Sequence, residues 1–370
     1  MRQTTAGMLA VALLVASMDL VVVITRRLDR EPAGVAAAER PPRTSAPVPT
    51  SLPSTTAAPA TTTLPPTTSP PPSTPAPPSP TTSETTAAPS PANEPALTAQ
   101  HSSGPWTVGP LRGVGAWIDV YDWTNELTNG QPSVLPPDID RMADLGVQTI
   151  YIQTAHRRSA ADVIEPDRLD ELIDRAHARD MAVVAWYLPT LEDVEVDLRR
   201  LLAAARLPID GLGVDIESRD VADPAERTRR LLDLSLRLRQ AVGDRAIAAI
   251  TPSAVHLQVI NPGFWPGFPW PELAATYDAI LPMAYWSIRR TEWRSGERYI
   301  GENIDRIRAS TGRPDVLIHP IGGIADGTTE ADVQGMVRAI ATRGAMGGSL
   351  YDWATANPAL WEAMRPLHAR

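Results

Sequence analysis

Short apolar segments alternate with amphipathic segments from Arg112 onward, and this alternation constrains the fold more than any other feature of the chain. A strand followed by a helix, repeated along a sequence, predicts a parallel sheet with helical crossovers. The apolar segments predict eight strands, at residues 113–121, 147–154, 182–188, 211–217, 246–251, 279–286, 316–321 and 348–353. Eight such units favour a closed barrel over an open doubly wound sheet. We therefore expect an α/β fold, a (β/α)8 TIM barrel.

The segments between the predicted strands carry the signals of helices. Residues 169–176 place Leu, Leu, Ile and Ala at the i, i+3, i+4 and i+7 positions of one helix face. Asp223 and Pro224 predict an N-cap followed by Pro in the first turn, and Gly243 predicts the end of the same helix. No G-x-G-x-x-G motif follows a strand and no P-loop motif occurs, so the sequence gives no support to dinucleotide or P-loop binding.

The N-terminal part of the chain differs in composition from the predicted barrel. Residues 7–25 are mostly apolar and are flanked by arginines, which predicts either a signal peptide or a single transmembrane anchor within residues 1–33. Residues 34–103 are rich in Pro, Thr and Ser and cannot bury enough apolar surface to fold, so we expect a disordered linker. Stalks of this composition are typical of exported proteins, which predicts an extracytoplasmic, membrane-anchored or secreted location. Residues 104–370 make up the barrel domain.

Charge and composition exclude several classes of function. The formal net charge of −9 gives the chain no electrostatic reason to bind nucleic acid. The sequence contains no Cys, which excludes disulfides, thiolate metal sites and a cysteine nucleophile. No H-E-x-x-H motif or other clustered ligand spacing occurs, so we expect no metal ion and no other cofactor. A membrane is an expected partner only through the N-terminal segment, if that segment is not cleaved.

Two carboxylates mark the predicted fourth strand. Side chains alternate between two faces along a strand, so Gly213, Asp215 and Glu217 share the face that points into the barrel. Barrel active sites lie at the C-terminal ends of strands, where this pair is found. Two carboxyl groups close together push their pKa values apart, which lets one of them stay protonated near neutral pH. A protonated carboxyl group is what a general acid needs at a glycosidic oxygen.

The fourth strand resembles the D-G-x-D-x-D-x-E signature of glycoside hydrolase family 18, the chitinases and their relatives. The motif stands here as Asp-Gly-Leu-Gly-Val-Asp-Ile-Glu over residues 210–217, with Gly213 where the family has Asp. The resemblance implies that Glu217 is the general acid. It also implies that Asp215 orients and charge-stabilises the substrate's N-acetyl group, which is the nucleophile in that family.

The predicted sixth strand is similar to that of the same family, which ends in M-x-Y followed by a polar residue. We expect Met283 and Tyr285 to face inward, and the resemblance implies a hydrogen bond between Tyr285 and the reacting acetamido group. Trp286 stands where Asp or Asn is common. An inward Asp119 on the first strand, together with D-x-E on the fourth, also resembles the family 25 lysozymes, which are the alternative family.

Aromatic and polar side chains near the predicted strand ends suit a glycan cleft, because sugar rings stack on aromatic faces. On the first strand, Trp117, Asp119 and Tyr121 share the inward face. The complete set of expected substrate-binding residues is Trp117, Asp119, Tyr121, Gln153, Trp186, Met283, Trp286, Tyr351 and Trp353. We interpret residues 156–158 (His-Arg-Arg), after the second strand, as a solvated loop, with substrate contact as the alternative.

Together these patterns predict a glycosidase with Glu217 as general acid, acting on an extracellular or cell-wall glycan with N-acetylated sugars, such as a polysaccharide or peptidoglycan. The alternative is a non-catalytic glycan-binding TIM barrel at the cell envelope. Gly213 and Trp286, the two departures from the family pattern, motivate that alternative.

Overall fold

The computed structural model describes residues 106–368 of the 370-residue chain. The predicted signal peptide or anchor, the predicted linker and the first residues of the predicted barrel domain lie outside this range, so those predictions stay predictions. No helix within residues 106–368 is long and apolar enough to cross a membrane.

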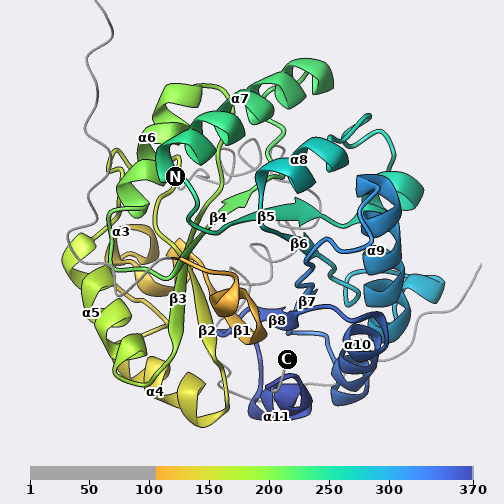
Figure 1. Cartoon of the computed structure of the whole chain (residues 1–370). Helices are drawn as coiled ribbons and strands as arrows, with labels where there is room; N and C mark the ends of the chain where they lie inside the picture. Colours follow the sequence, from red (N-terminus) through yellow and green to blue (C-terminus); the bar gives the residue numbers. More distant parts are fainter. Residues whose placement is uncertain (1–105, 369–370) are drawn as a thin grey trace, which may run out of the picture. The chain divides into compact units, whose positions relative to one another are not determined.

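Eight parallel strands close into a barrel in chain order, with β1 paired to both β2 and β8 (Figure 1). The strands are β1 (Gly113–Ile118), β2 (Thr149–Gln153), β3 (Ala182–Tyr187), β4 (Gly211–Asp215), β5 (Ile247–Pro252), β6 (Ala279–Met283), β7 (Ile321–Gly323) and β8 (Gly347–Tyr351). This arrangement confirms the predicted TIM barrel, whose active sites lie at the C-terminal ends of the strands.

Helices surround the strands, as Figure 1 shows. They are α2 (Val120–Trp123), α3 (Asn125–Thr128), α4 (Pro136–Asp144), α5 (Pro166–His177), α6 (Val194–Ala204), α7 (Pro224–Val242), α8 (Trp270–Thr276), α9 (Gly296–Thr311), α10 (Glu330–Arg343) and α11 (Pro358–Met364). Four further segments are 3-10 or π helices: η1 (Gly109–Leu111), η2 (His256–Ile260), η3 (Thr291–Trp293) and η4 (Arg365–Leu367).

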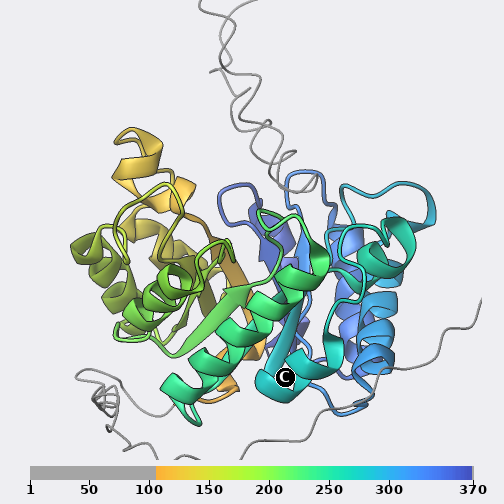
Figure 2. The same cartoon turned by 90° about the horizontal axis from the view of Figure 1, so that it is seen from above.

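The predicted caps of α7, which lies beside the strands in Figure 2, are confirmed. The Asp223 side chain accepts a hydrogen bond from the Ala225 amide at 3.1 Å. Pro224 occupies the first turn, where its missing N–H costs no hydrogen bond. The helix ends at Gly243, whose φ of 63° lies in the region that favours glycine.

Two hydrophobic layers stabilise the barrel, an inner layer enclosed by the strands and an outer layer between the strands and the helices. Alternate residues of each strand contribute to each layer, as the period of two requires. In the inner layer, the rings of Trp117 and Tyr151 stack with centroids 4.4 Å apart. Gly115 makes this stack possible, because a Cβ atom there would lie only 2.4 Å from the Tyr151 ring.

The first strand is shorter than predicted, because Asp119 begins a helix. The Asp119 side chain accepts a hydrogen bond from the Tyr121 amide at 2.7 Å, and the Asp119 amide donates to Asp122 Oδ2 at 3.0 Å. This reciprocal capping box ends β1 at Ile118 and starts α2. Tyr121 therefore lies on a helix at the end of the barrel and not on the inward face of a strand.

The seventh strand lies later in the chain than predicted. Residues 316–320 run beside β6 but form only one isolated bridge, between Ile318 and Ile280, before β7 begins at Ile321. Pro320 explains the interruption, because it has no N–H to donate to a strand ladder.

Candidate active site

The three residues predicted to be catalytic lie at the C-terminal ends of two strands. Asp215 is the last residue of β4, and Glu217 follows two positions later. Tyr285 follows two positions after Met283, the last residue of β6. All three residues therefore belong to the face of the barrel on which TIM-barrel active sites are built.

Asp215 is almost completely buried, with 5% of its surface exposed. Burial and, second, the nearby charge of Glu217 raise its pKa well above the ordinary value for aspartic acid. Its Oδ1 atom has no hydrogen-bond partner within residues 106–368. Glu217 is half-buried. The pair therefore combines a deep carboxyl group whose pKa is raised with a shallower one that stays in contact with solvent.

A buried donor lies on the strand next to this buried acid. The indole Nε1 of Trp186, on β3, has no hydrogen-bond partner in the part of the chain that the structure describes. Trp186 is 5% exposed, belongs to the inner layer and pairs in register with Gly213 of β4. Trp186 Nε1 and Asp215 Oδ1 are thus a buried donor and a buried acceptor on adjacent strands, each without a hydrogen-bond partner among residues 106–368.

Ile250 occupies the space in which a side chain at position 213 would lie. A Cβ atom at Gly213 would be 2.8 Å from Ile250 Cδ1 and 3.5 Å from the Cβ of Trp186. Ile250 pairs in register with Asp215 across the β4–β5 ladder. An apolar side chain thus fills the place of the additional Asp in the family 18 pattern, and Asp215 and Glu217 are an acidic pair at the C-terminal end of β4.

We expect Gly213→Asp to destabilise the protein by about 1–3 kcal/mol, because the added carboxylate displaces Ile250 and is buried among apolar side chains. Gly213→Ala is the matched control. Its cost should be smaller, since the only atom that one methyl group approaches too closely is the flexible end of Ile250. Denaturant unfolding of the three proteins measures both costs. A Gly213→Asp variant as stable as the unsubstituted protein would show that this position accommodates a third carboxylate.

Asp119 lies at the C-terminal end of β1 and is tied to β8. The Tyr351 hydroxyl donates to Asp119 Oδ2 at 2.8 Å, while the Tyr121 amide donates to Oδ1 at 2.7 Å. The Tyr351 ring lies 5.7 Å from that of Tyr285 and 6.4 Å from that of Trp117, between ring centroids. The structure thus brings together these residues of the predicted site around one end of the barrel.

Gln153 and Met283 are buried at the ends of β2 and β6. Gln153 Oε1 accepts from the Val120 amide at 3.2 Å, and its carbonyl oxygen accepts from Trp123 Nε1 at 3.0 Å. Gln153 therefore holds α2 in place. Met283 belongs to the inner layer and retains 8% exposure.

Besides Tyr121, two other aromatic residues predicted to bind substrate, Trp286 and Trp353, lie outside the inner layer. Trp286 is fully buried in the outer layer, where its ring lies against Gly322. The period of two explains this difference from the expectation, because Tyr285 faces inward and the next residue then faces the helices. Trp353 is half-buried and packs against Trp361 of α11, with ring centroids 5.6 Å apart.

Two further aspartates, which the sequence patterns did not single out, join Asp119. Asp122 and Asp352 are fully buried, and carboxylate oxygens of the three residues lie within 4.8 Å of one another. Oxygen ligands of this type suit Mg²⁺ or Ca²⁺. Each carboxylate also accepts hydrogen bonds from the protein, for example from the Thr355 hydroxyl to Asp352 at 2.8 Å. The position of Asp352, directly after β8, is the sequence signal that could have identified it.

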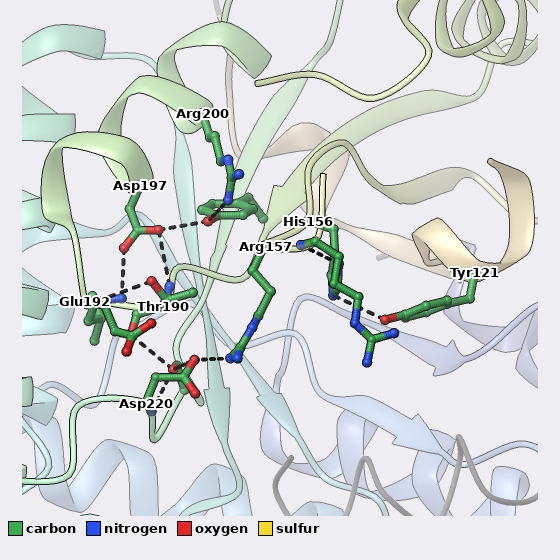
Figure 3. Close-up of polar contacts among 12 residues, drawn as sticks. Tyr121, His156, Arg157, Thr190, Glu192, Asp197, Arg200 and Asp220 are labelled. Atoms are coloured by element: carbon green, nitrogen blue, oxygen red, sulfur yellow. Dashed lines mark hydrogen bonds and ion pairs between the residues drawn. The ribbon is translucent and has the colours of Figure 1, made fainter. Parts of the chain in front are cut away.

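Hydrogen bonds fix the loop that follows β3 (Figure 3). Asp197 of α6 accepts from the Tyr187 hydroxyl at 2.8 Å and from the Leu191 amide at 2.8 Å. Arg200 donates to the same Tyr187 oxygen at 2.9 Å. Burial raises the pKa of Asp197, while these hydrogen bonds and the charge of Arg200 oppose that rise. The network gives the rim of the barrel a fixed geometry beside the end of β4.

In fold, the barrel is similar to three solved structures. A class V chitinase from Pseudomonas fluorescens has a TM-score of 0.50 and 9% identity, over 70% of this chain and 100% of that chain. The spore cortex-lytic enzyme SleL from Bacillus megaterium has a TM-score of 0.51 and 7% identity, over 69% and 74%. An endo-1,4-β-mannanase from Rhizomucor miehei has a TM-score of 0.52 and 11% identity, over 73% and 98%.

Identities this low show a shared fold. No family model matches the sequence, and no curated protein matches it.

Proposed function

We propose that this protein is a glycoside hydrolase that acts on an extracellular or cell-wall glycan with N-acetylated sugars. The carboxyl pair at the end of β4 carries the proposal: Asp215 is buried with a raised pKa, and Glu217 follows it in a half-buried position. The names of the chitinase and the spore cortex-lytic enzyme that share the fold support a glycan substrate. The Pro/Thr-rich composition of residues 34–103 supports an extracytoplasmic location, either membrane-anchored or secreted.

Glu217 is the general acid of the proposed reaction. It donates a proton to the glycosidic oxygen while the bond to the leaving sugar breaks. The proton comes from the carboxyl pair, because Asp215 retains a proton that it passes to Glu217. The Asp215 carboxylate then accepts a hydrogen bond from the acetamido N–H of the substrate. Its negative charge stabilises the positive charge that develops as the acetamido oxygen attacks the anomeric carbon.

Tyr285 and the inner-layer aromatics complete the proposed site. The Tyr285 hydroxyl donates a hydrogen bond to the acetamido oxygen and orients it for attack. Trp117, Trp186 and Tyr351 provide aromatic surface around the carboxyl pair, on which sugar rings stack. This assignment follows the resemblance to glycoside hydrolase family 18.

The test is the release of reducing ends from chitin oligosaccharides and from peptidoglycan by the purified protein. The proposal requires release by the unsubstituted protein and its loss in a Glu217→Gln variant.

A non-catalytic glycan-binding barrel at the cell envelope is the second candidate. Gly213 favours it, because Ile250 fills the space of an acidic residue that the family pattern includes. This candidate requires glycan binding with no turnover across the same panel of substrates.

A further inference from the structure

The loop that follows β2 places two arginines at the C-terminal face of the barrel, and only one of them forms an ion pair within residues 106–368. Arg157 forms an ion pair with Asp220, in the loop after β4, and Asp220 also accepts from the Ser218 hydroxyl at 3.2 Å (Figure 3). The exposed Arg158 side chain forms no hydrogen bond or ion pair with any residue between 106 and 368. One of the two positive charges is therefore neutralised within the protein, and the other is not.

His156 links this loop to Tyr121. Its Nδ1 atom lies 3.2 Å from the Arg158 amide, which can only donate, so Nδ1 carries no proton. Burial and, after it, the charges of Arg158, Arg157 and Arg200 lower the pKa of His156 to about 4, so the ring is neutral at physiological pH.

The remaining proton of the neutral ring lies on Nε2, which is 3.3 Å from the Tyr121 hydroxyl oxygen. Nε2 therefore donates to Tyr121, and the hydroxyl hydrogen of Tyr121 points away from His156. Tyr121 is half-buried and offers this hydrogen to an acceptor outside the network.

We propose that the Tyr121 hydroxyl and the Arg158 guanidinium form a subsite for an anionic substituent of the glycan, a carboxylate or a phosphate. Both groups donate hydrogen bonds, and a guanidinium binds such anions through two parallel N–H groups. The subsite deepens the proposed function and rests on it, because it assigns a substrate class to the same end of the barrel.

Asp119 and Asp122 flank Tyr121 in the chain, and both carboxylates are already engaged. Asp122 accepts from the Asp119 amide at 3.0 Å and from the Ser133 hydroxyl at 3.4 Å, and Asp119 accepts at both of its oxygens. Its Oδ1 atom accepts from the Tyr121 amide and its Oδ2 atom from the Tyr351 hydroxyl. The positive charges of the β2 loop act on the same region, as their effect on His156 shows. An anionic sugar is therefore favoured here over a neutral one.

Calorimetric binding to a Glu217→Gln protein, which leaves the glycan uncleaved, tests the subsite. The probes are an oligosaccharide of alternating N-acetylglucosamine and N-acetylmuramic acid, the same oligosaccharide with its carboxylates reduced to alcohols, and a phosphorylated N-acetylglucosamine oligosaccharide. We expect at least one anionic probe to bind about fivefold more tightly than the reduced one, with the preference weakening as salt rises. The tighter anion identifies the substituent as a carboxylate or a phosphate.

Combined with Glu217→Gln, Arg158→Gln should remove most of the preference for the anionic probe. Arg158→Lys should retain part of it, because Lys keeps the positive charge but lacks the planar guanidinium. Tyr121→Phe should weaken anion binding about threefold. Arg206→Gln, an exposed arginine in the loop between α6 and β4, is the matched control and should change nothing. An anion preference that survives Arg158→Gln, or equal affinity for all three probes, contradicts the subsite.

Turnover by the unsubstituted protein separates this inference from the proposed function. Cleavage of glycans without any anion preference would overturn the subsite alone. Arg158-dependent anion binding without cleavage would overturn the glycosidase assignment alone.

Discussion

Replacement of Glu217 by Gln should lower kcat/KM on an N-acetylated glycan by about 10²–10⁴-fold, the range that general acid catalysis contributes. Gln keeps the size of the side chain and its hydrogen-bonding capacity, but it has no acidic proton to give to the glycosidic oxygen. Glu217 is half-buried, so the change creates no cavity and leaves the fold intact. Reducing-end release measured over a range of substrate concentrations gives the decrease in kcat/KM.

A substrate with a better leaving group identifies the acid role. An aryl glycoside whose phenol leaves without protonation needs no general acid. The decrease in kcat/KM caused by Glu217→Gln should therefore be smaller with this substrate. A deficit of equal size on both substrates would contradict the assignment of Glu217 as the acid. Glu171→Gln makes the same chemical change on the exposed face of α5, and this control should leave turnover unchanged.

Replacement of Asp215 by Asn should lower kcat/KM by at least about 10²-fold. The same replacement should stabilise the protein at neutral pH. Activity is lost because Asn cannot hold the proton that the carboxyl pair supplies. Stability rises because burial disfavours the charged form of Asp215 and raises its pKa in the folded protein. Asn has the same shape and never ionises.

The stabilisation should depend on pH in a defined direction. Between the pKa of about 3.9 in the unfolded chain and the higher pKa in the folded protein, the folded state binds more protons, so its stability falls as pH rises. The difference in Tm between Asp215→Asn and the unsubstituted protein should therefore be smallest near pH 4 and grow toward pH 8. A domain of this size shifts by roughly 2–4 °C for each kcal/mol. A Tm difference that is constant with pH would show that folding does not raise the pKa of Asp215.

The strand period made much of the site predictable from the sequence. The alternation of side chains along β4 and β1 indicated inward positions for Asp215 and Trp117, and both are buried toward the barrel interior. The same rule, applied strictly, also places Trp286 in the outer layer, where the structure has it. The resemblance to family 18 instead suggested that Trp286 contacts substrate. A motif compares positions along the sequence and does not record the face on which each side chain lies.

Contacts between distant parts of the chain were not predictable from local patterns. The hydrogen bond from Tyr351 to Asp119 joins residues 232 positions apart, and it depends on the closure of β8 onto β1. The early end of β1 likewise depends on the reciprocal cap between Asp119 and Asp122, which competes with strand extension. The ion pair of Arg157 with Asp220 requires two loops to meet above an intervening strand, so a loop arginine looked solvated in the sequence.

The most direct test of the central claim is reducing-end release by the purified, unsubstituted protein on chitin oligosaccharides, peptidoglycan and other N-acetylated glycans at neutral pH. Release from at least one of these substrates, lost in Glu217→Gln, is the result expected of a glycosidase whose acid lies at the end of β4. Binding of the same glycans without any release of reducing ends would contradict it and would establish a glycan-binding barrel instead.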